Sequence, residues 1–352
     1  MLKKAFHLFS WLIIFCLFSA SLSGQGNDGI SLKNKKNSKI AYNKGVKSIQ
    51  DENFVVALEY FSTSLDYNPR FDLAYLMRGK TNLELQDTEA AIADFNMAIE
   101  INANLGEAYF YRAYTYLDED PGLEVLNDLS HAIDLGYKES FVYYYRGLYY
   151  LINEDYTSAI IDFTEALELN SRYPLAYHDR GSAKRLMGDY QGAIYDYRQA
   201  VNYDPDFPIA YNNMGSVRKM LGDFEGAVDD YSVAINLDST FYMAYNNRGG
   251  ARFQLGDYDG ALEDFDKVLG MQDDYLLAFN NKGSTLAKMN RIQEAITLLD
   301  SAIEGDNAFA NAYLNRGFVR ELLGDIEGAC EDWRKALELG IEEAAEYIKE
   351  CD

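Results

Sequence analysis

The chain repeats itself every 34 residues, and this period constrains its fold more than any other feature. An Ala-Tyr pair with a glycine five residues after the alanine marks most copies, as in Ala176-Tyr177 with Gly181 and Ala244-Tyr245 with Gly249. Arrays of such copies grow by addition, and each copy packs only on its neighbours. The length of 352 residues therefore says little about the number of globular domains.

A second set of landmarks predicts two helices in each copy. A small residue, usually alanine, is followed four residues later by a large apolar residue and three residues after that by another small one, as at Ala159, Phe163 and Ala166. Positions i, i+4 and i+7 share one face of a helix. The turn between the two helices reads Gly222-Asp223, or its equivalent, in several copies. Glycine suits the residue that ends a helix, and aspartate suits the N-cap of the next one.

These positions resemble the tetratricopeptide repeat family, and the match covers nearly the whole chain after its first segment. The resemblance implies an all-α fold: a right-handed superhelical α-solenoid of nine 34-residue helix-turn-helix repeats with a C-terminal capping helix. First helices would line a concave groove. The expected repeats are 38–71, 72–105, 106–139, 140–173, 174–207, 208–241, 242–275, 276–309 and 310–343, and the capping helix is 344–352.

The first residues are typical of an export signal. Lys3 and Lys4 precede a mostly apolar run, and Ser21 and Ser23 suit the −3 and −1 sites of cleavage. We expect residues 1–23 to be a signal peptide, with an uncleaved anchor as the alternative, and residues 24–37 to be a flexible leader. The destination is a periplasm, a cell surface or the medium.

Two cysteines, Cys330 and Cys351, remain after such cleavage. In an oxidising compartment they could form a disulfide that fastens the capping helix to the last repeat. The alternative is two separate thiols. A metal site is disfavoured because no histidine or further cysteine lies nearby in the sequence.

Arginine and aspartate recur sixteen residues apart, for example at Arg146 and Asp162. The same offset joins Arg78 to Asp94, Arg112 to Asp128, Arg180 to Asp196, Arg248 to Asp264, and Arg316 to Asp332. A ligand-binding charge ladder is one interpretation, and the repetition favours the other, an ion pair between the two helices of a repeat. The pair is incomplete in three repeats, where Lys44 faces Tyr60, Met214 faces Asp230 and Lys282 faces Leu298.

The resemblance places the fifth, sixth and ninth residues of each repeat near the concave surface. Asparagines gather at the fifth and sixth positions: Asn212, Asn213, Asn246, Asn247, Asn280, Asn281 and Asn315. A side-chain amide both donates and accepts hydrogen bonds, so this column could hold the backbone of an extended peptide. It is similar to the asparagine ladder of some tetratricopeptide grooves. The alternative is that asparagine merely suits an exposed helix surface. The carboxylate clamp of other family members is absent, because its lysines and arginine are missing.

Aromatic residues gather at the equivalent surface of the third and fourth repeats: Phe110, Tyr111, Tyr114, Tyr144 and Tyr145. Exposed aromatic side chains offer a large, stiff contact area for a protein or for sugars. The other interpretation is packing between adjacent first helices. The sequence predicts an exposed aromatic patch.

The net charge of −24 disfavours nucleic acid and anionic lipid as partners, because both require a basic face, and it predicts weak attraction of cationic partners. No catalytic constellation, metal-ligand spacing or cofactor motif occurs, so we assign no catalytic residue, no cofactor and no metal. The oligomeric state is not predicted. The leading interpretation is an exported protein-interaction scaffold, without catalytic activity, that holds an extended peptide or partner segment. The alternatives are a carbohydrate- or envelope-binding module using the aromatic residues, and a purely architectural protein.

Overall fold

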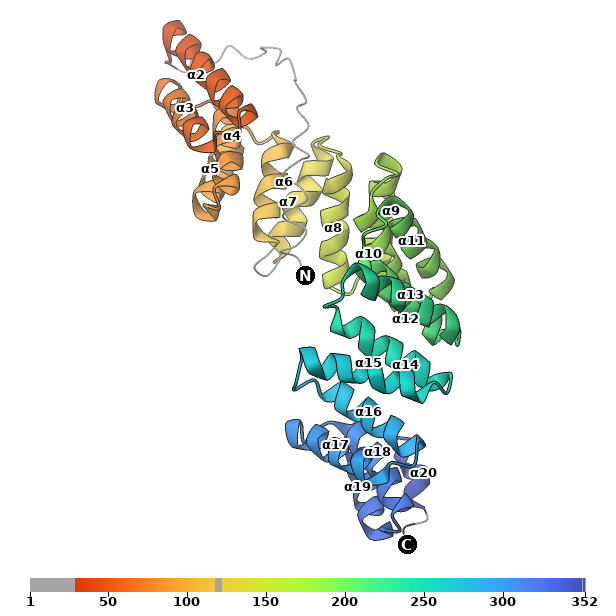
Figure 1. The fold of residues 1–352 in the computed structure, drawn as a ribbon. Helices are drawn as coiled ribbons and strands as arrows, with labels where there is room; N and C mark the ends of the chain where they lie inside the picture. Colours follow the sequence, from red (N-terminus) through yellow and green to blue (C-terminus); the bar gives the residue numbers. More distant parts are fainter. Residues whose placement is uncertain (1–28, 118–121, 350, 352) are drawn as a thin grey trace. The chain divides into compact units, whose positions relative to one another are not determined.

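The computed structural model describes residues 29–117, 122–349 and 351, and every regular element in them is a helix. The chain forms two compact bodies, an N-terminal body that ends at Ser171 and a C-terminal body that begins at Arg172. Within each body the helices follow one another as packed pairs (Figure 1). No described helix is long and apolar enough to cross a membrane. The predicted all-α array of helix pairs is confirmed.

The described residues of the N-terminal body form four helix pairs. They are α2 (Leu32–Gln50) with α3 (Phe54–Tyr67), α4 (Asp72–Glu84) with α5 (Thr88–Ile101), α6 (Gly106–Tyr116) with α7 (Leu123–Asp134), and α8 (Ser140–Ile152) with α9 (Tyr156–Leu169). Helix α2 corrects the expected leader, because residues 32–37 are helical rather than flexible. The Ser31 side chain caps this helix by accepting a hydrogen bond from the Asn34 backbone N–H. The expected signal, residues 1–23, lies outside the described residues.

The described residues of the C-terminal body form five pairs and a short last helix. They are α10 (Pro174–Leu186) with α11 (Tyr190–Tyr203), α12 (Pro208–Met220) with α13 (Phe224–Leu237), α14 (Tyr242–Gln254) with α15 (Tyr258–Met271), α16 (Leu276–Lys288) with α17 (Ile292–Gly305), and α18 (Ala310–Leu322) with α19 (Ile326–Glu338), followed by α20 (Ala344–Ile348). From α4 onward, each first helix begins at the residue where the sequence spacing places the start of a repeat.

The turns between paired helices have the predicted chemistry. In the sixth repeat Gly222 has a φ of 81°, in the left-handed region, and the Asp223 side chain accepts a hydrogen bond from the Gly226 backbone N–H. The same pair of roles recurs at Gly188, Gly256 and Gly324, each followed by a capping aspartate. These residues end one helix and start the next within two positions, which fixes the length of the hairpin.

A glycine in the first helix receives the large side chain of the second. A Cβ atom added at Gly79 would lie 2.6 Å from Phe95 Cε1, and one at Gly147 would lie 2.8 Å from Phe163 Cδ1. The rings of Phe95 and Phe163 are fully buried. The third repeat, which has Ala113 in place of glycine, has the smaller Leu129 in place of the ring. Helix spacing in each pair therefore depends on the volume of this one contact.

Successive repeats also touch through their first helices. In the C-terminal body α10 contacts α12, α12 contacts α14, α14 contacts α16, and α16 contacts α18, and each second helix packs on the next first helix. In the described part of this body, second helices of successive repeats make no comparable contacts with one another. The first helices therefore lie side by side along the inner, more closely spaced side of the array. Their solvent-exposed side chains form one continuous surface on that side, which we call the first-helix face.

All six predicted Arg–Asp pairs are present. Arg146 Nε and Nη2 donate to the two carboxylate oxygens of Asp162 at 2.7 and 2.8 Å, and the Asp162 side chain is only 3% exposed. A further nitrogen of the same guanidinium, Nη1, reaches Ser130 in the second helix of the preceding repeat. Arg78, Arg112, Arg248 and Arg316 repeat this three-helix connection. The structural interpretation of the pairs is confirmed, since these donors bind inside the fold.

The sixth repeat lacks the arginine of the Arg–Asp pair, and the negative charge of its buried aspartate is poorly compensated. Asp230 is buried with Met214 in the arginine's position, and its nearest cation is Arg218, whose Nε lies 3.3 Å from Asp230 Oδ2. That carboxylate oxygen accepts no aligned hydrogen bond from the described residues. Burial raises the pKa of Asp230 to about 7, because desolvation outweighs the attraction of Arg218 and nearby Asp223 and Asp229 add repulsion.

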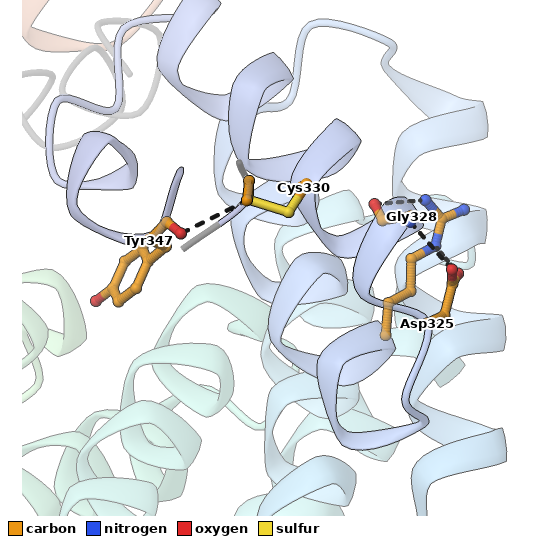
Figure 2. Close-up of a disulfide and its surroundings, with 6 residues drawn as sticks. Asp325, Gly328, Cys330 and Tyr347 are labelled. Carbon is orange, nitrogen blue, oxygen red and sulfur yellow. Dashed lines mark hydrogen bonds and ion pairs between the residues drawn. A yellow bond between two sulfur atoms is a disulfide. The ribbon is translucent and has the colours of Figure 1, made fainter. Parts of the chain in front are cut away.

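The last repeat is closed by α20 and a disulfide. Cys330 of α19 and Cys351 are joined, with Cα atoms 5.7 Å apart (Figure 2). On the same end, Tyr347 lies edge-on to Phe318 at a centroid distance of 4.8 Å and 5.5 Å from Trp333. The short helix thus covers apolar surface that a further repeat would otherwise cover.

Replacement of Asp230 by asparagine should remove a pH dependence of stability. A carboxyl whose pKa is near 7 in the folded state and roughly 4 in the unfolded state binds its proton more tightly when folded, so stability falls as pH rises from about 4 to about 7. We expect Asp230→Asn to gain stability relative to the wild type between pH 5 and pH 8, measured by urea unfolding. The control, Asp264→Asn, should destabilise at both pH values because Arg248 and Arg252 lose their partner. A pH-independent difference between wild type and Asp230→Asn would contradict this account.

Removal of the disulfide should loosen the end of the array and leave its middle unchanged. The bridge closes a sequence separation of 21 residues, so the loop-entropy model gives a local loss of about 3 kcal/mol. In Cys330→Ala/Cys351→Ala we expect faster amide hydrogen exchange in α20 and α19. Exchange in α12 should not change, because each repeat contacts only its neighbours. Unchanged protection of α20 would show that the aromatic contacts alone hold it.

Candidate peptide-binding surface

Asparagines at the sixth position of successive repeats form a row on the first-helix face of the C-terminal body. We call Asn213, Asn247, Asn281 and Asn315 the amide row. Each is partly exposed. Because they occupy the same position on first helices that contact their neighbours, they are evenly spaced along the array. The structure thus brings together four of the seven asparagines predicted from the sequence.

The three fifth-position asparagines are placed differently. Asn212, Asn246 and Asn280 are 6–9% exposed and lie between first helices. Each accepts a hydrogen bond on its side-chain oxygen from the amide row of the following repeat: Asn247 Nδ2 to Asn212 at 3.0 Å, Asn281 Nδ2 to Asn246 at 3.1 Å, and Asn315 Nδ2 to Asn280 at 2.8 Å. Their assignment as peptide-binding residues is therefore corrected. Adjacent residues of a helix point about 100° apart. When the sixth position faces the exposed surface, the fifth position therefore points at the next repeat.

The amide row keeps hydrogen-bonding capacity on its exposed side. A side-chain amide has two N–H donors and an oxygen with two lone pairs. Asn247 and Asn315 each use one donor in the contacts just described. Asn281 uses one donor and also accepts from Asn280 at 3.2 Å. The inter-repeat hydrogen bonds fix the orientation of each amide while half of its donors stay unused in the described structure.

His178, at the fifth position of the fifth repeat, contacts the first asparagine of the amide row, a role that the sequence analysis did not assign. Its Nε2 lies 2.9 Å from Asn213 Nδ2, and its Nδ1 lies 2.8 Å from Asp179 Oδ1. An amide N–H can only donate, so Nε2 accepts and the ring proton sits on Nδ1, facing the carboxylate. This arrangement holds the first amide of the row in one orientation. The signal was visible as a histidine at the fifth position, where later repeats have asparagine.

Two buried tyrosines of the second helices place their hydroxyls beside serines of the first helices. The Tyr197 hydroxyl lies 3.1 Å from Ser182 Oγ, and the Tyr231 hydroxyl donates to Ser216 Oγ at 3.2 Å. Burial raises the pKa of Tyr231 to about 12, so this phenol stays protonated at neutral pH. Sequence reasoning treated these two residues as core rings only. The sequence pattern that could have revealed these contacts is a tyrosine in place of phenylalanine in the second helix, together with a serine at the ninth position of the same repeat.

The predicted exposed aromatic patch of the N-terminal body is wrong for its main members. Phe110, Tyr144 and Tyr145 are 3–6% exposed. Phe110 lies 4.8 Å from Phe141 and 5.9 Å from Tyr145 between ring centroids, so α6 and α8 bury these rings against each other. Tyr111 and Tyr114 keep partial exposure. Packing between adjacent first helices, the other interpretation of the pattern, accounts for the arrangement.

One face of the Tyr111 ring is covered by a charged side chain. Lys80 Nζ lies 4.4 Å from the centre of its ring and donates to Glu107 at 2.8 Å. This contact uses the face of the ring that a sugar would need. Across the described residues, no group of three or more histidine, cysteine, aspartate or glutamate side chains could hold a metal ion.

Comparisons with known proteins match the repeat pattern. A "TPR repeat" model matches residues 181–222, and "Tetratricopeptide repeat" models match residues 49–105, 142–173 and 221–275. No curated protein matches the chain by sequence.

Several solved structures share the fold. A tetratricopeptide repeat protein from Parabacteroides merdae is 18% identical, with a TM-score of 0.57 over 69% of this chain and 97% of that one. The structure titled as the APC/C hetero-tetramer Cut9–Hcn1 is 16% identical, with a TM-score of 0.56 over 88% of this chain and 62% of that one. Pseudomonas aeruginosa PilF is 21% identical, with a TM-score of 0.52 over 60% and 97%. At these identities the likeness concerns the fold alone. The family models and the stacked helix pairs together show that both bodies of this chain contain tetratricopeptide repeats.

Proposed function

We propose that this chain is a protein-interaction scaffold and that the amide row of its C-terminal body holds an extended peptide by its backbone. The observation that carries the proposal is the row itself. Four amides at equal intervals are held in fixed orientations by neighbouring repeats and keep unused donors on an exposed face. A fixed amide binds a peptide group without the entropy cost of ordering a mobile side chain.

The spacing of the row suits an extended chain. First helices in contact lie about 8–10 Å apart. A polyproline II segment advances roughly 9 Å in each turn of three residues. The same side of such a peptide would therefore meet one amide per turn. Peptide groups offer both a donor and an acceptor, which matches what each asparagine can accept and donate.

Apolar side chains beside the row add contact area. Met243 and Leu277, at the second position of the seventh and eighth repeats, are 37% and 44% exposed on the same helices. A polyproline II peptide that is bound through its backbone directs every third side chain toward the surface. These residues give the scaffold a preference for apolar side chains without a deep pocket. A carbohydrate-binding role gains no comparable support, since the rings that would carry it are buried.

The amide row can be tested against its own buried partners. Asn213→Ala/Asn247→Ala/Asn281→Ala should abolish capture of peptides from an array of unstructured peptides about ten residues long, enough to span the row. The matched control is Asn212→Ala/Asn246→Ala/Asn280→Ala. It breaks the hydrogen bonds from Asn247, Asn281 and Asn315 and leaves the exposed amides in place. Each lost hydrogen bond costs about 1 kcal/mol of stability, so the melting temperatures of both variants should fall by a similar amount. Capture of peptides by Asn213→Ala/Asn247→Ala/Asn281→Ala at the wild-type level would mean that the row is structural only.

We propose in addition that the scaffold acts outside the cytoplasm. Support comes from the Lys3–Lys4 and apolar sequence of the first segment, and from the Cys330–Cys351 bridge, since disulfides persist mainly in oxidising compartments. Expression with its native first segment in a secreting bacterial host should give an exported protein that begins at Gly24. Mass spectrometry of the N-terminal peptide measures this directly, and retention of residues 1–23 in the cytosolic fraction would refute it.

A further inference from the structure

One helix on the first-helix face contains a glycine that the fold does not require. Gly250 lies inside α14 at the ninth position of its repeat, where neighbouring repeats have Ser182, Ser216 and Ser284. A Cβ atom added at Gly250 would meet nothing within 4 Å, whereas one at the adjacent Gly249 would lie 2.7 Å from Phe265. Glycine within a helix is destabilising. At 250 the absent side chain leaves open space on the partly exposed side of α14.

The second feature is a cation without a carboxylate, on the neighbouring first helix α12. Lys219, near the end of α12, is partly buried, and burial lowers its pKa with no acidic group offsetting the effect. The described structure gives it no ion pair, whereas Lys184, Arg218, Arg252 and Arg320, on the same set of helices, each pair with an aspartate. Arg185, the equivalent residue of the preceding repeat, lies near the Tyr197 phenol, where it partly offsets the rise that burial causes in the pKa of that phenol.

The register of the helices puts these two features together. The Asn247–Asn212 hydrogen bond sets position six of α14 against position five of α12. Seven residues further along both helices, Lys219 comes level with Gln254. A long helical side chain extends back toward the helix N-terminus and covers the turn before its own Cα. The Lys219 ammonium is thereby carried toward the level of Gly250, one turn before Gln254.

We propose that Lys219 and Gly250 form a carboxylate subsite, at which an aspartate or glutamate of the bound peptide pairs with the Lys219 ammonium while the peptide backbone passes closely over Gly250. This inference rests on the proposed peptide-binding function and adds the chemistry of the partner. A peptide on the amide row reaches this point one helical turn beyond Asn247. The ammonium has three donors and no competing carboxylate in the described structure. The rest of the acidic surface is screened beyond about 8 Å at physiological salt, and a direct pair is not.

A positional-scanning library of acetylated and amidated peptides about ten residues long tests the charge preference. We expect the wild-type protein to select aspartate or glutamate at one position. The best peptide should bind about tenfold more tightly than its form with asparagine or glutamine at that position. Lys219→Met should remove this difference. Lys267→Met, which removes an exposed lysine from α15, should keep it. Selection that is unchanged in Lys219→Met would overturn the subsite.

A second pair of variants tests the close approach. Gly250→Ala should raise the melting temperature and weaken the acidic peptide, because a methyl group occupies the path of the backbone. Gly270→Ala, in α15, also adds a methyl group in open space and should leave binding unchanged. Tight binding by a more stable Gly250→Ala would reject the proposed path. If no peptide of any sequence is captured, the proposed function fails and this inference with it. Capture through the amide row without an acidic preference overturns the inference alone.

Discussion

The contact between a first-helix glycine and a second-helix ring sets the geometry on which everything else in each repeat depends. At Gly79 and Phe95 the ring occupies the space of the missing side chain. The two helices then lie close enough for arginine to reach across the pair. In the third repeat, where the smaller Leu129 replaces the ring, Ala113 replaces the glycine and much of the volume is conserved. Because protein interiors are close-packed, this matching of volumes is a stronger constraint than helix propensity, which glycine lowers.

The Arg–Asp pairs convert a single hairpin into an array. In Arg78, Arg112, Arg146, Arg248 and Arg316 the guanidinium binds a buried aspartate in its own repeat and a polar side chain in the preceding one, so an isolated repeat cannot supply all of its partners. A buried carboxylate left without its arginine is costly, so the pair holds the two helices of a repeat together. The remaining contact of the guanidinium, such as Arg146 with Ser130, joins that repeat to the one before it. Asp230 shows what happens when the arginine is missing: the carboxylate stays buried, and its pKa rises to about 7. The sixth repeat persists because its glycine–ring contact, between Gly215 and Tyr231, is intact.

Most of the fold could be predicted from the sequence because the deciding interactions recur at fixed offsets. The 34-residue period locates helix starts, the Gly-Asp turns locate their ends, and the sixteen-residue offset locates the ion pairs. The leader was harder to predict, since a single capping residue, Ser31, extends α2 into a polar stretch with no apolar period. The surface was only half predictable. Periodicity says that Asn212 and Asn213 both lie on the first-helix face, but the exposure of each depends on the distance and angle to the neighbouring helix. The same geometry buries Tyr145 against Phe110.

Composition and local structure lead to opposite expectations for the partner. A net charge of −24 predicts attraction of cationic segments. Net charge describes only the field far from the protein and ignores where each charge lies. Many of the aspartates are internal and are paired with arginine in every complete repeat. Binding is decided within a few ångströms of the peptide, where distant charges are screened and the nearest unpaired group dominates. On the first-helix face we propose that this group is Lys219, to which the described structure gives no ion pair. An acidic surface around one cationic subsite disfavours most anionic segments, and a segment binds only when its carboxylate is in register with the amide row.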